Sequence, residues 1–116
     1  MIFYRYNLHS PLARQLKVLL NVAELDDLVR SLSEVSRRIV LFGSCAEGSD
    51  VRESDIDLFI LSDDRRAARR MISIEAKAGR RIAPIILNAV EFSEMMRRDK
   101  PLYGQVSKGL VLWETG

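Results

Sequence analysis

The first part of the chain carries two apolar stripes with helical spacing. Ser10 followed by Pro11 is typical of a helix start, with an N-cap and then proline at the first helical position. Apolar residues then recur at intervals of three and four, which predicts a helical segment over about residues 11–36. The first stripe is Leu12, Leu16, Leu19, Leu20 and Ala23, and the second is Leu25, Leu28, Val29, Leu32 and Val35. The pattern leaves open whether Asn21 divides this segment into two helices.

Beyond residue 36 the pattern changes to short continuous apolar runs, which are typical of buried strands. Four such runs are present, at residues 39–42, 55–61, 82–87 and 109–113. Pro84 lies inside the third run. Because proline cannot donate a hydrogen bond to a neighbouring strand, we expect this strand at a sheet edge or with a bulge.

Two further helices are expected between these strands. Residues 62–64 offer N-caps for a helix that extends to about residue 78, where Gly79 ends it. A shorter helix is expected over 91–98, ended by Pro101. The elements therefore alternate between helices and strands, which predicts an α/β (α+β) fold with a mixed sheet of about four strands flanked by helices.

Length and composition limit the number of domains and the classes of function that the chain can have. A chain of 116 residues has room for one domain over residues 1–116, with the main core over about 37–114. The 18 Lys and Arg residues nearly balance the 16 Asp and Glu residues, so charge alone does not imply binding to nucleic acid. Cys45 is the single cysteine and excludes an internal disulfide. No apolar run approaches the roughly 18 residues needed to span a bilayer, so we expect no membrane and a cytoplasmic location.

Candidate chemistry is concentrated in residues 43–57, between the first two predicted strands. Asp55 and Asp57 lie two residues apart on a strand, so they project from one face with their Cα atoms roughly 6.6 Å apart. Two such carboxylates repel each other unless a cation lies between them, and hard oxygen ligands suit Mg²⁺ or Mn²⁺. The pair therefore predicts a site for a divalent cation.

The turn that begins this segment is suited to an anion. Gly43 permits backbone conformations that other residues avoid, and it lets the following N–H groups approach a ligand, while Ser44 adds a hydroxyl. A phosphate held here beside a metal held by Asp55 and Asp57 is the layout that transfer of a nucleotidyl group requires.

These residues also carry a family resemblance. Gly43-Ser44, ten residues, and then Asp55-Ile56-Asp57 resemble the G-S-x10-D-x-D signature of the DNA polymerase β-like nucleotidyltransferase superfamily, in particular its minimal nucleotidyltransferase (MNT) branch. The resemblance implies a polymerase β-like fold. It also implies that Gly43 and Ser44, with Ser54 before the first aspartate, bind the nucleotide, and that Asp55 and Asp57 bind the catalytic metal.

The sequence departs from that family at two places. Active members usually supply a third carboxylate from the next strand, but residues 81–88 contain no acid, and Ala83 or Pro84 stands at the expected place. The sequence offers two kinds of substitute for this carboxylate. Asn88 would be a neutral metal ligand, and Glu91 or Glu75 would be a base displaced from the usual position. Glu47 also stands where many minimal nucleotidyltransferases carry arginine.

Two functions are consistent with these features. One is a Mg²⁺-dependent (or Mn²⁺-dependent) enzyme that moves AMP or another NMP from an NTP to a hydroxyl of a protein or RNA acceptor. The alternative is a catalytically degenerate, nucleotide-binding partner of antitoxin type. The resemblance implies a small HEPN-type protein as partner. The sequence also leaves open two further arrangements: the chain forms a homodimer, or it is the catalytic piece of a longer protein.

Other polar residues have simpler interpretations. Cys45 is expected to be a small buried side chain, and His9 is given no role. The seven cations between residues 65 and 81 are expected to form a solvated helix face. They are Arg65, Arg66, Arg69, Arg70, Lys77, Arg80 and Arg81.

Overall fold

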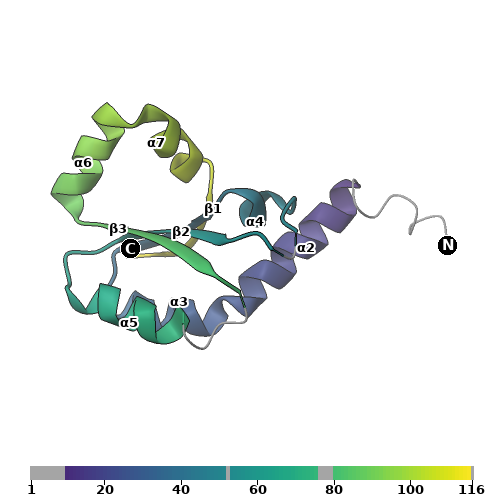
Figure 1. Ribbon diagram of the computed structural model, residues 1–116, viewed down its shortest axis with the longest axis horizontal. Helices are drawn as coiled ribbons and strands as arrows, with labels where there is room; N and C mark the ends of the chain where they lie inside the picture. The colour runs from purple at the N-terminus through teal and green to yellow at the C-terminus, as the bar shows by residue number, and fades with distance from the viewer. Residues whose placement is uncertain (1–9, 52, 76–79, 116) are drawn as a thin grey trace.

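The computed structural model describes residues 10–51, 53–75 and 80–115. Its elements are arranged in space as Figure 1 shows. In chain order they are α2 (Pro11–Glu24), α3 (Asp26–Ser33), β1 (Arg38–Phe42), α4 (Ser44–Glu47), β2 (Ile56–Leu61), α5 (Arg66–Glu75), β3 (Ile82–Leu87), α6 (Ala89–Arg98), α7 (Lys100–Ser107) and β4 (Leu110–Glu114). The expected mixed α/β architecture is confirmed, and His9, Lys77, Ala78 and Gly79 lie outside the described residues.

The four strands form one mixed sheet in the order β3-β2-β1-β4. β1 is antiparallel to both β2 and β4, whereas β3 runs parallel to β2. β3 is therefore an edge strand, as Pro84 predicts. The register places Asp57 beside Phe42 on one side and beside Ala83 on the other, so these three side chains share one face of the sheet.

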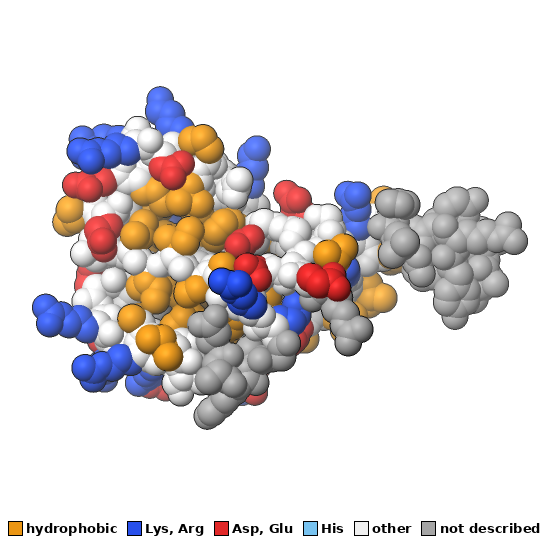
Figure 2. Space-filling model, viewed as in Figure 1, with side chains coloured by type: hydrophobic (Ala, Val, Ile, Leu, Met, Phe, Trp, Pro, Cys, Tyr) orange, Lys and Arg blue, Asp and Glu red, His pale blue; other side chains and the backbone are white. Residues whose placement is uncertain are grey.

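Helices cover the two faces of the sheet unequally. α3 and α5 pack on one face, where Leu32, Leu58 and Met71 belong to the larger core (Figure 1). The other face, with Phe59 as its central residue, packs against α6 and α7 in a smaller core. Hydrophobic side chains remain visible at the surface between these two helices and the sheet in Figure 2, where a groove of about 310 Å³ lies. The aspartate face is thus the less covered one.

The helix start at Ser10 is confirmed, because the Ser10 hydroxyl accepts a hydrogen bond of 3.0 Å from the Ala13 amide. The predicted segment divides into two helices at Leu25, not at Asn21. Its second stripe is buried, but the first faces outward, with 51–65% of each leucine side chain exposed. These residues are Leu12, Leu16, Leu19 and Leu20. Periodicity predicts an apolar face but not what covers it, and α2 projects beyond the sheet (Figure 1).

Two other expectations need correction. Pro101 does not simply end a helix, because α6 ends at Arg98 and Pro101 lies in the first turn of a further helix, α7. Proline suits that position since its missing N–H would have no partner inside the helix. The segment between β1 and β2 is also not all loop, because it contains the short helix α4.

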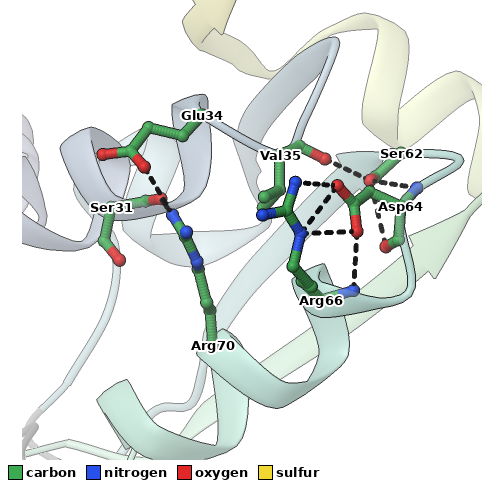
Figure 3. Close-up of polar contacts among 7 residues, drawn as sticks. All are labelled: Ser31, Glu34, Val35, Ser62, Asp64, Arg66 and Arg70. Carbon is green, nitrogen blue, oxygen red and sulfur yellow. Dashed lines mark hydrogen bonds and ion pairs between the residues drawn. The ribbon is translucent and has the colours of Figure 1, made fainter.

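The basic run around α5 is only partly a solvated face. Arg66 pairs with Asp64 at 2.7 Å, and Arg70 joins α5 to α3 through the Ser31 carbonyl and the Glu34 carboxylate (Figure 3). Arg80 is different, since only 18% of its side chain is exposed and it contacts residues of the 43–57 segment. The expectation that all seven cations are solvated is therefore wrong for Arg80.

Within the described residues, the structure contains no helix that is both long and apolar enough to cross a membrane.

Candidate functional site

Gly43 and Asp57 are in direct contact at the end of β1. Gly43 adopts a φ of +73°, a left-handed conformation that favours glycine. A Cβ atom added to Gly43 would lie 2.4 Å from the Asp57 Oδ2 atom, which is far below van der Waals contact. Any other residue at position 43 would therefore displace the Asp57 carboxylate. Glycine is therefore required at position 43 for two reasons, the positive φ of the turn and the close approach of the Asp57 carboxylate.

The two aspartates form an electrostatically unfavourable pair. Burial raises the pKa of the Asp57 carboxyl, and repulsion by Asp55 raises it further. Among the described residues, no lysine or arginine forms an ion pair with either carboxylate. A divalent cation would relieve this repulsion, and two carboxylates are suitable ligands for Mg²⁺ or Mn²⁺. The donor set therefore fits a cation, although no third Asp, Glu, His or Cys joins it within the described part of the chain.

A pocket of about 550 Å³ opens beside Gly43 and Ser44 and is closed on its far side by α7. This volume is within the usual range for small-molecule sites. α7 and its C-cap residue line the pocket with Lys100, Gly104 and Lys108, which recur every fourth residue and so lie along one side of the helix. Nothing lies within 4 Å of where a Cβ of Gly104 would be, so the middle of this face is open. The pocket thus places two cations opposite the glycine-serine turn.

Lys100 and Lys108 were not among the residues expected from the sequence. Their spacing of eight residues is a helical signal, but it becomes visible only if residues 100–107 are recognised as a helix. Glu47 also lines the pocket, so the negative charge noted in the sequence does lie near the predicted phosphate position.

A comparison with family models decides the ancestry of this site. The model described as polymerase beta, nucleotidyltransferase, matches residues 23–115, which covers most of the chain. The chain belongs to the polymerase beta nucleotidyltransferase family. The match includes β1, α4 and β2, which contain Ser44 and Asp57 and are directly preceded or followed by Gly43 and Asp55. No curated protein matches the chain significantly.

Several solved structures share the nucleotidyltransferase fold with this chain. A chain of the toxin-antitoxin MntA-HpeT, determined as a mutant, is 22% identical with a TM-score of 0.56, over 81% of this chain and 73% of that chain. A toxin-antitoxin determined with AMP-PNP gives 24% identity and a TM-score of 0.53, over 82% and 74%. A tri-AMPylated Shewanella oneidensis HEPN toxin in complex with MNT antitoxin gives 22% and 0.51, over 84% and 73%. These likenesses concern the fold.

The register of the sheet identifies the residue at the place expected for the third carboxylate of this nucleotidyltransferase family. Ala83 pairs with Asp57 across the parallel strands and shares its face, whereas Pro84 points to the other face. Asn88 and Glu91 form the capping box of α6, at the opposite end of β3. Asn88 lies five residue steps beyond Ala83, roughly 16 Å along an extended chain, and Glu91 follows it in the helix. The structure therefore does not bring Asn88 or Glu91 to Asp57, and the Glu75 side chain lies outside the described residues.

Ser54 and Cys45 support the segment that connects the two halves of the motif. The Ser54 hydroxyl accepts a hydrogen bond of 3.0 Å from the Val51 amide, so its oxygen stabilises the turn before Asp55. Cys45 is fully buried, as expected, and burial is the main cause of the raised pKa of its thiol. A nucleotide contact by Ser54 stays a prediction.

Proposed function

We propose that this chain is a nucleotidyltransferase that depends on Mg²⁺ or Mn²⁺ and transfers a nucleoside monophosphate from an NTP to a hydroxyl group. The observation that carries the proposal is the Asp57 carboxylate, close enough to Asp55 to be repelled by it, held against Gly43, which with Ser44 lines an open pocket. In the reaction the acceptor oxygen attacks the α-phosphorus, the bond to the β-phosphate oxygen breaks, and pyrophosphate leaves. ATP is the proposed donor, and the AMP-PNP in a structure of the same fold supports this choice.

In this proposal some residues bind the phosphates, and others hold the cation or supply charge. Asp55 and Asp57 would hold the cation, which when bound neutralises phosphate charge and lowers the pKa of the attacking hydroxyl. The Gly43 and Ser44 turn binds the phosphates from one side. Lys100 at the start of α7 and Lys108 at its C-cap supply positive charge from the other side, which offsets the negative charge of Glu47.

The proposed acceptor is a hydroxyl of a HEPN-type protein. Support comes from the Shewanella oneidensis structure of the same fold, in which a tri-AMPylated HEPN toxin is in complex with an MNT antitoxin. An RNA hydroxyl is the other acceptor class that the sequence leaves open, and a homodimer is a further arrangement to be tested by light scattering.

A second function is favoured by one specific observation. Ala83 stands where a third carboxylate is expected, and no described acid replaces it. In this second function the chain is a nucleotide-binding partner of antitoxin type. It neutralises a HEPN-type protein by binding it, without transfer of a nucleotidyl group.

One experiment separates the two functions. The chain is incubated with each of the four α-labelled NTPs and Mg²⁺ or Mn²⁺, in the presence of its genomic neighbour or of bulk tRNA. Label on an acceptor that disappears in the Asp55→Ala/Asp57→Ala variant supports the transferase. Metal-dependent NTP binding by calorimetry without label supports the second function. No binding of any Mg²⁺-NTP contradicts both.

The role of the pocket is tested by two substitutions at Gly104. Gly104→Ala is expected to raise the melting temperature, because alanine favours helix by about 1 kcal/mol and its Cβ meets open space. It should change ATP affinity little. Gly104→Leu is expected to weaken ATP binding about tenfold or more, because the leucine side chain would occupy pocket space that the nucleotide needs, and a loss of about 1.4 kcal/mol lowers affinity tenfold. Equal ATP affinity in calorimetry for a folded Gly104→Leu variant would place the nucleotide elsewhere.

A further inference from the structure

The Arg80 guanidinium joins three parts of the chain behind the candidate site. Its Nη2 atom lies 3.1 Å from the Asp50 Oδ2 atom, 3.1 Å from the Ser54 carbonyl oxygen and 3.3 Å from the Cys45 sulfur. Only 18% of the Arg80 side chain and 2% of the Asp50 side chain are exposed. Arg80 immediately precedes Arg81, whose carbonyl accepts a hydrogen bond from the Ile56 amide at the start of β2. A charged cluster is therefore buried directly behind the first aspartate of the motif.

Asp50 is held from a second direction by α2. The Asn21 amide donates to the Asp50 Oδ1 atom and to the Cys45 carbonyl, both at 3.1 Å. Lys17, one turn earlier, donates to the Asp50 carbonyl and lies 3.9 Å from its carboxylate. The Asp50 carboxylate thus receives both a cation and an amide. Its position, and with it the position of Arg80, is fixed by a helix outside the motif.

The backbone around Asp55 is held by the same cluster. Arg80 binds the carbonyl of Ser54, which precedes Asp55, and the Cys45 thiol donates to the carbonyl of Asp55 itself at 3.7 Å. The next amide, that of Ile56, donates to the Arg81 carbonyl at 2.9 Å. The peptide groups on both sides of the Asp55 Cα are therefore anchored. This anchoring limits the directions in which the Asp55 carboxylate can point.

We propose that Arg80, oriented by Asp50, is a positioning residue that sets the direction of the Asp55 carboxylate toward the cation. The inference rests on the proposed function, which makes Asp55 a metal ligand. A buried ion pair is costly to desolvate, and an apolar pair would fill the space with no such cost. The guanidinium instead holds two donor nitrogens in one rigid plane: Nη2 binds the Asp50 carboxylate and the Ser54 carbonyl, while Nη1 donates to the Asn21 Oδ1 atom at 3.4 Å.

Arg80→Lys tests this role, because lysine keeps the charge next to Asp50 but cannot reproduce the planar fork. We expect the variant to remain folded and to bind Mn²⁺ with ATP about tenfold more weakly, measured by electron paramagnetic resonance of free Mn²⁺. Groups that orient metal ligands typically contribute ten- to a hundredfold to metal affinity. Asp50→Asn should weaken binding in the same direction, since it releases the guanidinium.

Arg70→Lys is the matched control. Arg70 also binds a backbone carbonyl, that of Ser31 at 2.7 Å, and a carboxylate, that of Glu34 at 3.0 Å (Figure 3). It joins α5 to α3, however, and these helices cover the face of the sheet opposite to the Asp57 side chain. Any stability cost of replacing such an arginine by lysine should show in this variant, and its Mn²⁺ affinity should equal that of the wild type.

The outcomes separate the inference from the proposed function. Wild-type Mn²⁺ affinity in a folded Arg80→Lys variant overturns the positioning role alone. If Arg80→Lys does not fold, the double variant Asp50→Asn/Arg80→Met is used in its place, because it leaves neither charge of this pair buried. Wild-type Mn²⁺ affinity in the folded double variant likewise overturns the positioning role. If the wild type binds no Mn²⁺ with ATP, the proposed function fails. The anchoring is then judged by hydrogen exchange at the Ile56 amide, which Arg80→Lys accelerates if Arg80 orders this segment and leaves unchanged if it does not.

Discussion

Asp57→Asn is expected to weaken Mn²⁺-ATP binding by at least about 100-fold and, at the same time, to raise the melting temperature of the free protein at neutral pH. The loss follows because a direct ligand should contribute no less than the groups that orient it. The gain follows because burial and repulsion by Asp55 raise the pKa of the Asp57 carboxyl. An acid whose pKa is higher in the folded state loses its stability contribution as the pH rises through that pKa.

The pH dependence of the melting temperature checks the cause of this gain. At a pH near 3.8, the ordinary pKa of the carboxyl, Asp57 begins to be neutral in the unfolded chain too, so the difference between the variant and the wild type should shrink. Asp63→Asn is a suitable control, since Asp63 is an exposed aspartate and its ion pair with Arg37, at 3.6 Å, is also exposed. Unchanged Mn²⁺-ATP affinity in Asp57→Asn would contradict the assignment of the metal site.

Ala83→Asp is expected to increase the rate of nucleotidyl transfer by about 10²–10⁴-fold, the range that a well-placed general base contributes. The register places residue 83 directly beside Asp57 on the same face of the sheet. A carboxylate there can accept the proton of the attacking hydroxyl. The release of pyrophosphate from ATP measures the effect, because pyrophosphate leaves whether water or a protein hydroxyl is the acceptor.

Ala83→Asn separates charge from size in this experiment. Asparagine has nearly the shape of aspartate but does not act as a base, so we expect no rate increase from it. The aspartate variant should also be less stable without metal, because a third carboxylate adds repulsion, and Mn²⁺ should restore its stability. An Ala83→Asp variant that binds Mn²⁺-ATP but transfers no faster than the wild type would show that residue 83 is not the missing position.

Local patterns predicted much of this architecture because they depend on near neighbours. The Ser10 cap, the strand at 39–42 and the edge position of the strand with Pro84 follow from backbone chemistry that operates within a few residues. The projection of Asp57 from one face of β2 follows from the two-residue period of a strand, whereas Asp55 directly precedes this strand. The glycine-serine turn and the aspartate pair were therefore visible in the sequence together.

Properties that depend on distant parts of the chain were decided only by the tertiary structure. Helical spacing marked the leucine stripe of α2, but the Asn21 and Lys17 contacts with Asp50 turn its polar side inward and leave the stripe exposed. In the sequence, Arg80 does not differ from the surface arginines near it, and only the fold places the buried Asp50 carboxylate next to its guanidinium. Burial and charge pairing are set by residues far apart along the chain, so local composition does not reveal them.

The same division applies to the site. The sequence by itself predicted which residues would bind a cation and phosphates, because the spacing of Gly43, Ser44, Asp55 and Asp57 is a property of one short segment of the chain. The contact of Asp57 with Gly43, the two lysines across the pocket and the choice of Ala83 over Pro84 required the packing of α7 and the strand register. Register and helix packing arise from long-range contacts, and only the folded chain specifies them.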